Sequence, residues 1–116
     1  IKTVLLDQSI VSGIGNIYSD EILFKAGILP QTRACDISKT RALSLHDAIN
    51  DVISKGIKAN QSSIEAYMLG AREQYSDLEK MNVYQKSGKK CMVCGTKIEK
   101  LTIGGRSSCF CPNCQR

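Results

Sequence analysis

The sequence predicts a mainly α-helical fold that ends in a small β-hairpin. Three observations predict it: apolar residues recur at helical spacing between positions 45 and 57, a Gly-Gly pair separates two strand-like segments, and Cys-x-x-Cys pairs flank those segments. The 116 residues are enough for one ordinary domain or two small ones. We therefore divide the chain into a helical domain over 1–69, a linker or loop over 70–90 and a hairpin module over 91–116.

The N-terminal segment predicts two helices joined by a tight glycine loop. Residues 1–8 are typical of a short helix, and Ser-Gly-Ile-Gly at 12–15 is typical of a loop. Asn16 then fits the N-cap of a second helix over about 17–26. The sequence thus predicts a helix, a loop and a helix in quick succession.

The second helix carries two acidic residues and a clear stop signal. Asp20 and Glu21 are expected near its N-terminal half, where the helix dipole favours negative charge. Gly27 fits the C′ position, because a left-handed backbone suits glycine, and Pro30 prevents any continuation.

A longer helix is expected from Asp36 or Ser38, either of which can cap it, to about Ala59. Its apolar stripe consists of Leu45, Ile49, Val52, Ile53 and Ile57. Ser62-Ser63-Ile64-Glu65 matches a capping box, so a separate short helix is predicted to begin there and to end at about Met68. Residues 70–90 show no clear period, which favours a long loop.

The C-terminal segment predicts a two-stranded hairpin. Lys97–Ile103 and Arg106–Phe110 are rich in strand formers, and Gly104-Gly105 between them suits a turn that needs positive φ. A Cys-x-x-Cys pair lies at each base of this hairpin.

The spacing of these cysteines predicts one structural zinc ion. Sixteen residues separate Cys91-x-x-Cys94 from Cys111-x-x-Cys114, which is typical of four-cysteine zinc sites. Four sulfurs fill the tetrahedral shell, so no position stays open for a substrate. Disulfides, a redox Cys-x-x-Cys and an iron–sulfur cluster are the alternatives. Cys35 and Cys109 are left over as idle or buried thiols, although Cys109 is close enough in sequence to replace a ligand.

Charge is distributed unevenly along the chain. Residues 80–116 hold eight Lys or Arg and one Glu, a balance of +7, whereas residues 1–79 hold eight basic and ten acidic residues. Such an excess of positive charge favours binding to a polyanion such as nucleic acid. The alternative is a basic face that is simply solvated. No apolar run approaches the roughly 18 residues that span a bilayer, no signal peptide is visible, and cysteines in metal-type pairs favour a reducing cytoplasm.

Three residues are candidates for contact with a polyanion. Arg106 follows the hairpin turn, where a guanidinium can fork onto phosphate oxygens, or simply close the turn. Asn16 stands at a helix N-terminus behind two glycines, a setting that suits phosphate but also simple capping. Lys2 can add a further phosphate contact or remain a solvated lysine. No set of catalytic side chains stands out.

Two motifs resemble a known family. The segment from Ile1 to Gln8, followed by Gly13-Ile14-Gly15-Asn16-Ile17-Tyr18 and its continuation to Pro30, resembles the helix–two-turns–helix region of bacterial formamidopyrimidine-DNA glycosylases. Gly104-Gly105-Arg106-Ser107-Ser108 and Cys111-Pro112-Asn113-Cys114-Gln115-Arg116 resemble the zinc finger that closes those proteins. The related endonuclease VIII group, which removes oxidised pyrimidines, shares this plan and stays an alternative.

The resemblance implies a base-excision repair enzyme. Such enzymes flip an oxidised purine, such as 8-oxoguanine or formamidopyrimidine, out of duplex DNA, remove it, and cleave the abasic site by β,δ-elimination. Their nucleophile is an N-terminal proline assisted by an adjacent Glu. Neither residue is in this chain, which corresponds to the C-terminal half, so we expect a missing N-terminal catalytic domain and no activity from this part alone.

The resemblance also assigns residues. Arg106 is expected to grip phosphates beside the lesion and to assist δ-elimination, while Asn16 and Lys2 contact the DNA backbone. The loop before the zinc finger departs from the family, since Gly70 to Leu78 lacks the usual Gly-Tyr-Phe type motif. The resemblance implies that this loop lies over the flipped base, so its divergence is expected to bear on lesion preference.

Two other functions remain. A zinc-ribbon module for RNA is one, because a similar finger closes some isoleucyl-tRNA synthetases, and a protein-interaction domain is the other. For the repair protein we expect damaged double-stranded DNA as partner, a monomer, no membrane, and a bacterial cytoplasm with nucleoid association.

Overall fold

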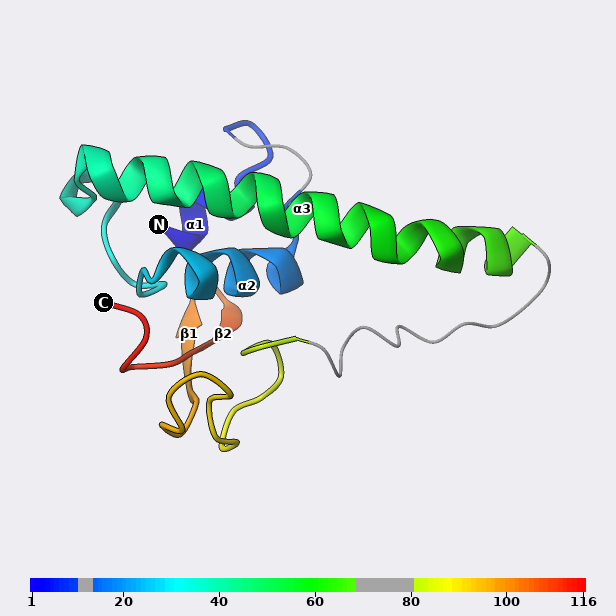
Figure 1. The fold of residues 1–116 in the computed structure, drawn as a ribbon. Coiled ribbons are helices and arrows are strands. Elements are labelled where there is room, and N and C mark those ends of the chain that lie inside the picture. The colour runs from blue at the N-terminus through cyan, green and yellow to red at the C-terminus, as the bar shows by residue number, and fades with distance from the viewer. Residues whose placement is uncertain (11–13, 69–80) are drawn as a thin grey trace.

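The computed structural model describes residues 1–10, 14–68 and 81–116, with 56–68 as backbone only. Its helices are α1 (Lys2–Leu6), α2 (Asn16–Ala26), the short 3-10 helix η1 (Ala34–Asp36) and α3 (Lys39–Met68). Strands β1 (Glu99–Ile103) and β2 (Arg106–Phe110) form an antiparallel hairpin. Figure 1 shows α2 in the middle, with α3 across one side and the hairpin on the other. The predicted mainly α fold with a small hairpin is confirmed.

Helix α2 begins one residue earlier than predicted. Gly15 holds the N-cap position with extended backbone (φ −97°, ψ −178°), and Asn16 is already helical, so the prediction that Asn16 caps the helix is wrong. The Asn16 side-chain amide instead donates to the Ser107 carbonyl of β2, so this side chain points toward the hairpin and does not cap the first turn of α2. The predicted end is confirmed, because Gly27 is left-handed (φ +72°) and its N–H bonds back to Leu23 and Phe24.

Helix α3 begins as expected but does not break. The Ser38 hydroxyl accepts the N–H of Arg41 at 3.2 Å, which makes Ser38 the cap. The helix then continues through Gly56 and Ser62 to Met68, so the predicted second helix from Ser62 is wrong. A cap stabilises by about 1 kcal/mol, whereas a break leaves several backbone groups unpaired at each new end. Among the described helices, none is both long and apolar enough to cross a membrane.

Two apolar clusters lie on opposite sides of α2. The first joins α1, α2 and α3 through buried Leu5, Ile14, Ile22, Leu23, Ile28, Leu45 and Ala48, and the predicted stripe residues Ile49, Val52 and Ile53 pack against it. The second lies under the hairpin and consists of Val83, Cys91, Ile98, Cys109 and Cys111, with Phe24 of α2 packed against it. Helix α2 is therefore shared by both halves of the fold.

The hairpin turn has the predicted geometry. Gly104 (φ +57°) and Gly105 (φ +79°) link the paired residues Ile103 and Arg106, as a primed two-residue turn requires. A Cβ on Gly104 would lie 3.6 Å from the Thr3 hydroxyl, so the tip of the hairpin rests near α1.

The segment before the first cysteine packs with the hairpin. Val83 is fully buried in the second cluster. Gly88 donates to the Ile98 carbonyl at 2.9 Å, and Ile98 donates to the Lys89 carbonyl at 2.8 Å. The first part of the predicted loop, residues 70–80, lies outside the described residues.

Candidate zinc centre and nucleic-acid interface

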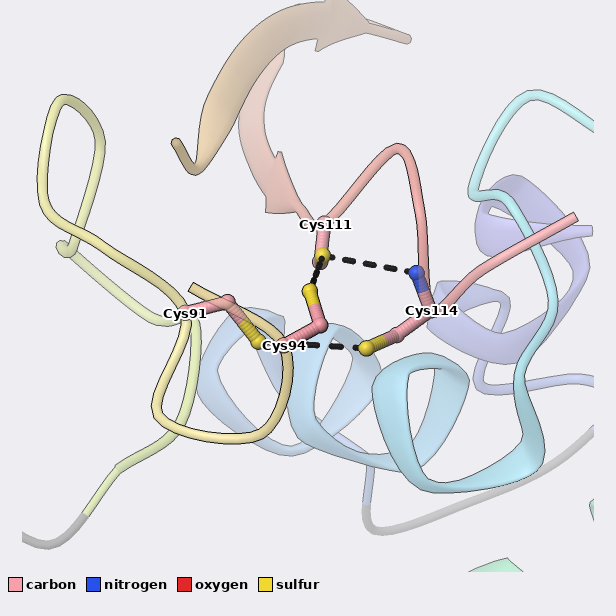
Figure 2. A group of neighbouring side chains, drawn as sticks. All are labelled: Cys91, Cys94, Cys111 and Cys114. Atoms are coloured by element: carbon pink, nitrogen blue, oxygen red, sulfur yellow. Dashed lines mark hydrogen bonds between the residues drawn. The ribbon is translucent and has the colours of Figure 1, made fainter. Parts of the chain in front are cut away.

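The four predicted zinc ligands come together at one point. All four Sγ atoms lie within 4.8 Å of one another. The Sγ atoms of Cys94 and Cys111 are 3.4 Å apart, and those of Cys91 and Cys114 are 3.9 Å apart. A tetrahedron with zinc–sulfur bonds of about 2.3 Å has edges of about 3.8 Å. Figure 2 shows the side chains pointing inward, and the donor set fits one structural zinc ion.

Each cysteine pair is shaped by its own backbone. The Val93 N–H donates to Cys91 Sγ, and the Cys114 N–H donates to Cys111 Sγ, each at 3.4 Å. Donors aimed at sulfur favour the thiolate form that zinc requires. The short Cys-x-x-Cys spacing therefore supplies both the ligands and the groups that orient them.

The thiols differ in acidity. Hydrogen bonds with Thr96 lower the pKa of Cys94 to about 5. Burial raises the pKa of Cys111 and of Cys114 above the usual range. Because zinc binds thiolates, binding must remove protons from these two, and zinc affinity is expected to fall as pH decreases.

The two remaining cysteines lie apart from this cluster. Cys109 is buried in the second apolar cluster, and Cys35 is exposed on η1. The structure groups neither with the four ligands in the part of the chain that it describes.

The three residues predicted to contact DNA meet around one carbonyl group. The Lys2 ammonium donates to the Ser107 carbonyl at 2.9 Å, and the Asn16 amide donates to the same oxygen at 3.3 Å. Arg106 is the preceding residue, at the start of β2. Residues that are 91 and 105 positions apart in sequence thus bond to one carbonyl next to Arg106.

Lys2 is the least accessible of the three. Its side chain is fully buried and its Nζ atom lies 2.8 Å from Asp20 Oδ1. An ammonium group has three donors, and two of them already bond to Asp20 and Ser107. In this structure Lys2 holds β2 against α1 and α2.

Arg106 and Asn16 present donors at the surface. The Arg106 side chain is exposed, and within the described residues its guanidinium has neither an ion pair nor a hydrogen bond. Asn16 is half-buried, and its Oδ1 atom is buried without a described partner. Gly15 opens the approach, because a Cβ there would meet nothing within 4 Å.

Comparison with known families accounts for both halves of the fold. The model of the formamidopyrimidine-DNA glycosylase H2TH domain matches residues 1–68, more than half of the chain. The chain belongs to the formamidopyrimidine-DNA glycosylase family. A second model, the zinc finger found in FPG and IleRS, matches residues 88–116.

Curated members of the glycosylase family align with the whole chain. Formamidopyrimidine-DNA glycosylases of Geotalea daltonii and Lactobacillus helveticus are 44% and 43% identical over 116 residues, covering 100% and 99% of this chain. The chain spans about two fifths of their length, 43% and 42% respectively.

Solved structures of glycosylases with DNA are also similar. Lactococcus lactis Fpg with abasic-site DNA has a TM-score of 0.84 at 39% identity, over 99% of this chain and 41% of that chain. MutM with DNA containing carbocyclic 8-oxo-G has a TM-score of 0.84 at 40% identity, over the same shares.

Sequence reasoning missed what Asp20 and Glu21 do. Besides lying in the N-terminal half of α2, both are buried hydrogen-bond acceptors, exposed by only 2% and 5%. Glu21 accepts the N–H groups of Asn82 and Val83, the latter at 3.0 Å, and burial raises its pKa despite these bonds. The only available signal was a pair of adjacent acidic residues followed directly by the apolar run Ile22, Leu23 and Phe24.

Proposed function

We propose that this chain is the DNA-binding part of a DNA glycosylase and AP lyase that removes oxidised purines from duplex DNA. The relatives are named as formamidopyrimidine-DNA glycosylases, and similar structures hold abasic, FAPY-dG or carbocyclic 8-oxo-G DNA. The nucleophilic proline and its Glu belong to another part of the protein.

The observation that carries this proposal is the exposed Arg106, whose guanidinium has no partner among the described residues and whose neighbour Ser107 is bonded to Asn16, on a hairpin with the four zinc ligands at its base. A guanidinium binds two phosphate oxygens in parallel, and the first N–H groups of α2 add donors at a positive helix end. The Asn16 Nδ2 group, which donates to the Ser107 carbonyl in this structure, would add a further donor when a phosphate oxygen replaces that carbonyl as its acceptor. Together these groups would grip the backbone of a strand and carry no base-specific contact.

Lys2 supports this grip in two ways. Its charge lies at the Ser107 carbonyl, to which Asn16 also donates, and it fixes the residue that follows Arg106. Because its side chain is fully buried, its third N–H group is out of reach of a phosphate in this conformation, so we propose that Lys2 acts through its bonds to Asp20 and Ser107.

The parent protein is proposed to act as a monomer in the bacterial cytoplasm, in association with the nucleoid. In support, the aligned relatives are bacterial proteins. The basic excess of residues 80–116 suits the DNA polyanion that this location offers.

The binding and excision steps can be tested separately on the zinc-loaded 116-residue chain. We expect it to bind a short duplex with an abasic site, measured by fluorescence anisotropy, and to release no base from an 8-oxoguanine duplex. Robust excision by this chain alone would contradict the proposal that it binds DNA while another part of the protein carries out catalysis. Tighter binding to tRNA than to the abasic duplex would instead favour the RNA-binding alternative.

Replacing Arg106 tests the phosphate contact. Arg106→Ala is expected to weaken binding by about 10–100-fold, because a charge-assisted hydrogen-bond pair is lost. The slope of log Kd against log salt concentration should flatten by about one phosphate, equally for damaged and undamaged duplexes.

Two variants control for net charge. Arg106→Lys keeps the charge but not the fork, and should recover only part of the affinity. Arg33→Ala removes an exposed charge outside the hairpin and should leave the salt slope nearly unchanged. An unaltered slope in Arg106→Ala would remove Arg106 from the phosphate site.

A further inference from the structure

We propose that Asp20 is a positioning residue that sets where Arg106 stands for its phosphate. This inference rests on the proposed function, in which Arg106 contacts DNA. Asp20 itself is 2% exposed and therefore cannot touch the ligand. Its influence has to pass through the strand that it holds.

One carboxylate ties α2 to two other elements. Asp20 Oδ1 accepts a bond from Lys2 Nζ at 2.8 Å and from the Ser108 hydroxyl at 2.9 Å. Asp20 Oδ2 accepts the N–H of Cys109 at 3.2 Å. Two consecutive residues of β2 are thus bonded to a single side chain of α2, so the strand can neither slide nor turn there.

This arrangement is costly unless it is complete. An ionised carboxylate out of water needs a counter-charge and hydrogen bonds, and here it has Lys2 and two further donors. Asp has a short side chain with few rotatable bonds, so fixing both oxygens fixes β2 directly to the α2 backbone. A buried pair of this kind gives orientation more than it gives stability.

The position of Asp20 complements that of zinc. Cys111 lies five residues after Arg106, or about 16 Å along an extended strand, whereas Ser108 is about 7 Å away. An isolated two-stranded hairpin is only marginally stable, so its tip would be mobile if zinc held its base and nothing held its tip. Zinc fixes the base near Cys111, and the Asp20 carboxylate fixes the strand close to Arg106.

A double-mutant cycle separates positioning from general stability. Four zinc-loaded chains are compared for binding to the abasic-site duplex at one salt concentration, well below their melting temperatures: the unmodified chain, Asp20→Asn, Arg106→Ala and the double variant. Asp20→Asn is expected to weaken binding about tenfold in the unmodified chain and less than about twofold when Arg106 is already absent. Asp51→Asn removes a carboxylate on the surface of α3 and should change neither value.

The alternative results are distinct. If Arg106→Ala weakens binding but Asp20→Asn does not, or if the two effects multiply, Asp20 does not act through Arg106 and this inference is wrong. If Arg106→Ala itself leaves affinity unchanged, the proposed phosphate contact fails first.

A milder variant keeps the test decisive should Asp20→Asn fail to retain zinc. Ser108→Ala removes one donor and leaves the Lys2–Asp20 pair intact. It should weaken binding by about threefold, with retained zinc content, and the loss should vanish in the Arg106→Ala background. A loss of the same size in both backgrounds would overturn the inference.

Discussion

Chelation of zinc is expected to unfold residues 81–116 while the helical half persists. The second apolar cluster has five buried residues, of which Cys91 and Cys111 are themselves zinc ligands. Such a small core cannot fold a hairpin alone, whereas structural zinc contributes about 10–16 kcal/mol in zinc-finger peptides. The first cluster contains no zinc ligand and should survive.

Amide NMR spectra before and after chelation would measure this effect. Hairpin signals should collapse while α2 and α3 signals stay dispersed, and DNA affinity should fall at least as far as it does in Arg106→Ala. Restoring zinc should restore both. Cys35→Ser, which changes an exposed cysteine away from the site, should retain zinc, whereas Cys111→Ser should lose it. A hairpin that stays intact after complete chelation would overturn the zinc argument.

Lys2→Met is expected to destabilise the fold by about 3–5 kcal/mol, because it leaves the Asp20 carboxylate buried without its counter-charge. The bonds from Ser108 and Cys109 remain but carry no full positive charge. Chemical denaturation of the zinc-loaded chain, followed by circular dichroism, would measure the change in the free energy of unfolding.

A second Lys–Asp pair provides the matched control. Lys25 of α2 pairs with Asp51 of α3 at the surface, where Asp51 also pairs with Lys55 at 3.0 Å. Lys25→Met should hardly move the unfolding curve, because water solvates both partners. The double variant Lys2→Met with Asp20→Asn should regain part of the lost stability, since it buries no unpaired charge. Equal effects of Lys2→Met and Lys25→Met would contradict the buried ion pair.

Local sequence signals predicted the parts of the fold that depend on near neighbours. The left-handed Gly27, the Gly104-Gly105 turn and the Cys-x-x-Cys pairs each depend on a few adjacent residues. Two local signals did not decide the structure. The Asn16 side chain bonds to the Ser107 carbonyl and does not cap α2, and the residues of the capping box at Ser62 lie inside the continuous helix α3.

The sequence by itself determined the four-cysteine centre and the hairpin, because metal chemistry and turn geometry leave few alternatives at those spacings. Only the tertiary structure decided that Lys2, Asp20 and Ser108 form one buried polar cluster. Its members are 18 and 88 residues apart, have no periodicity, and look like surface residues when taken singly. Burial of a charge is a property of everything packed around it, and no local pattern encodes that.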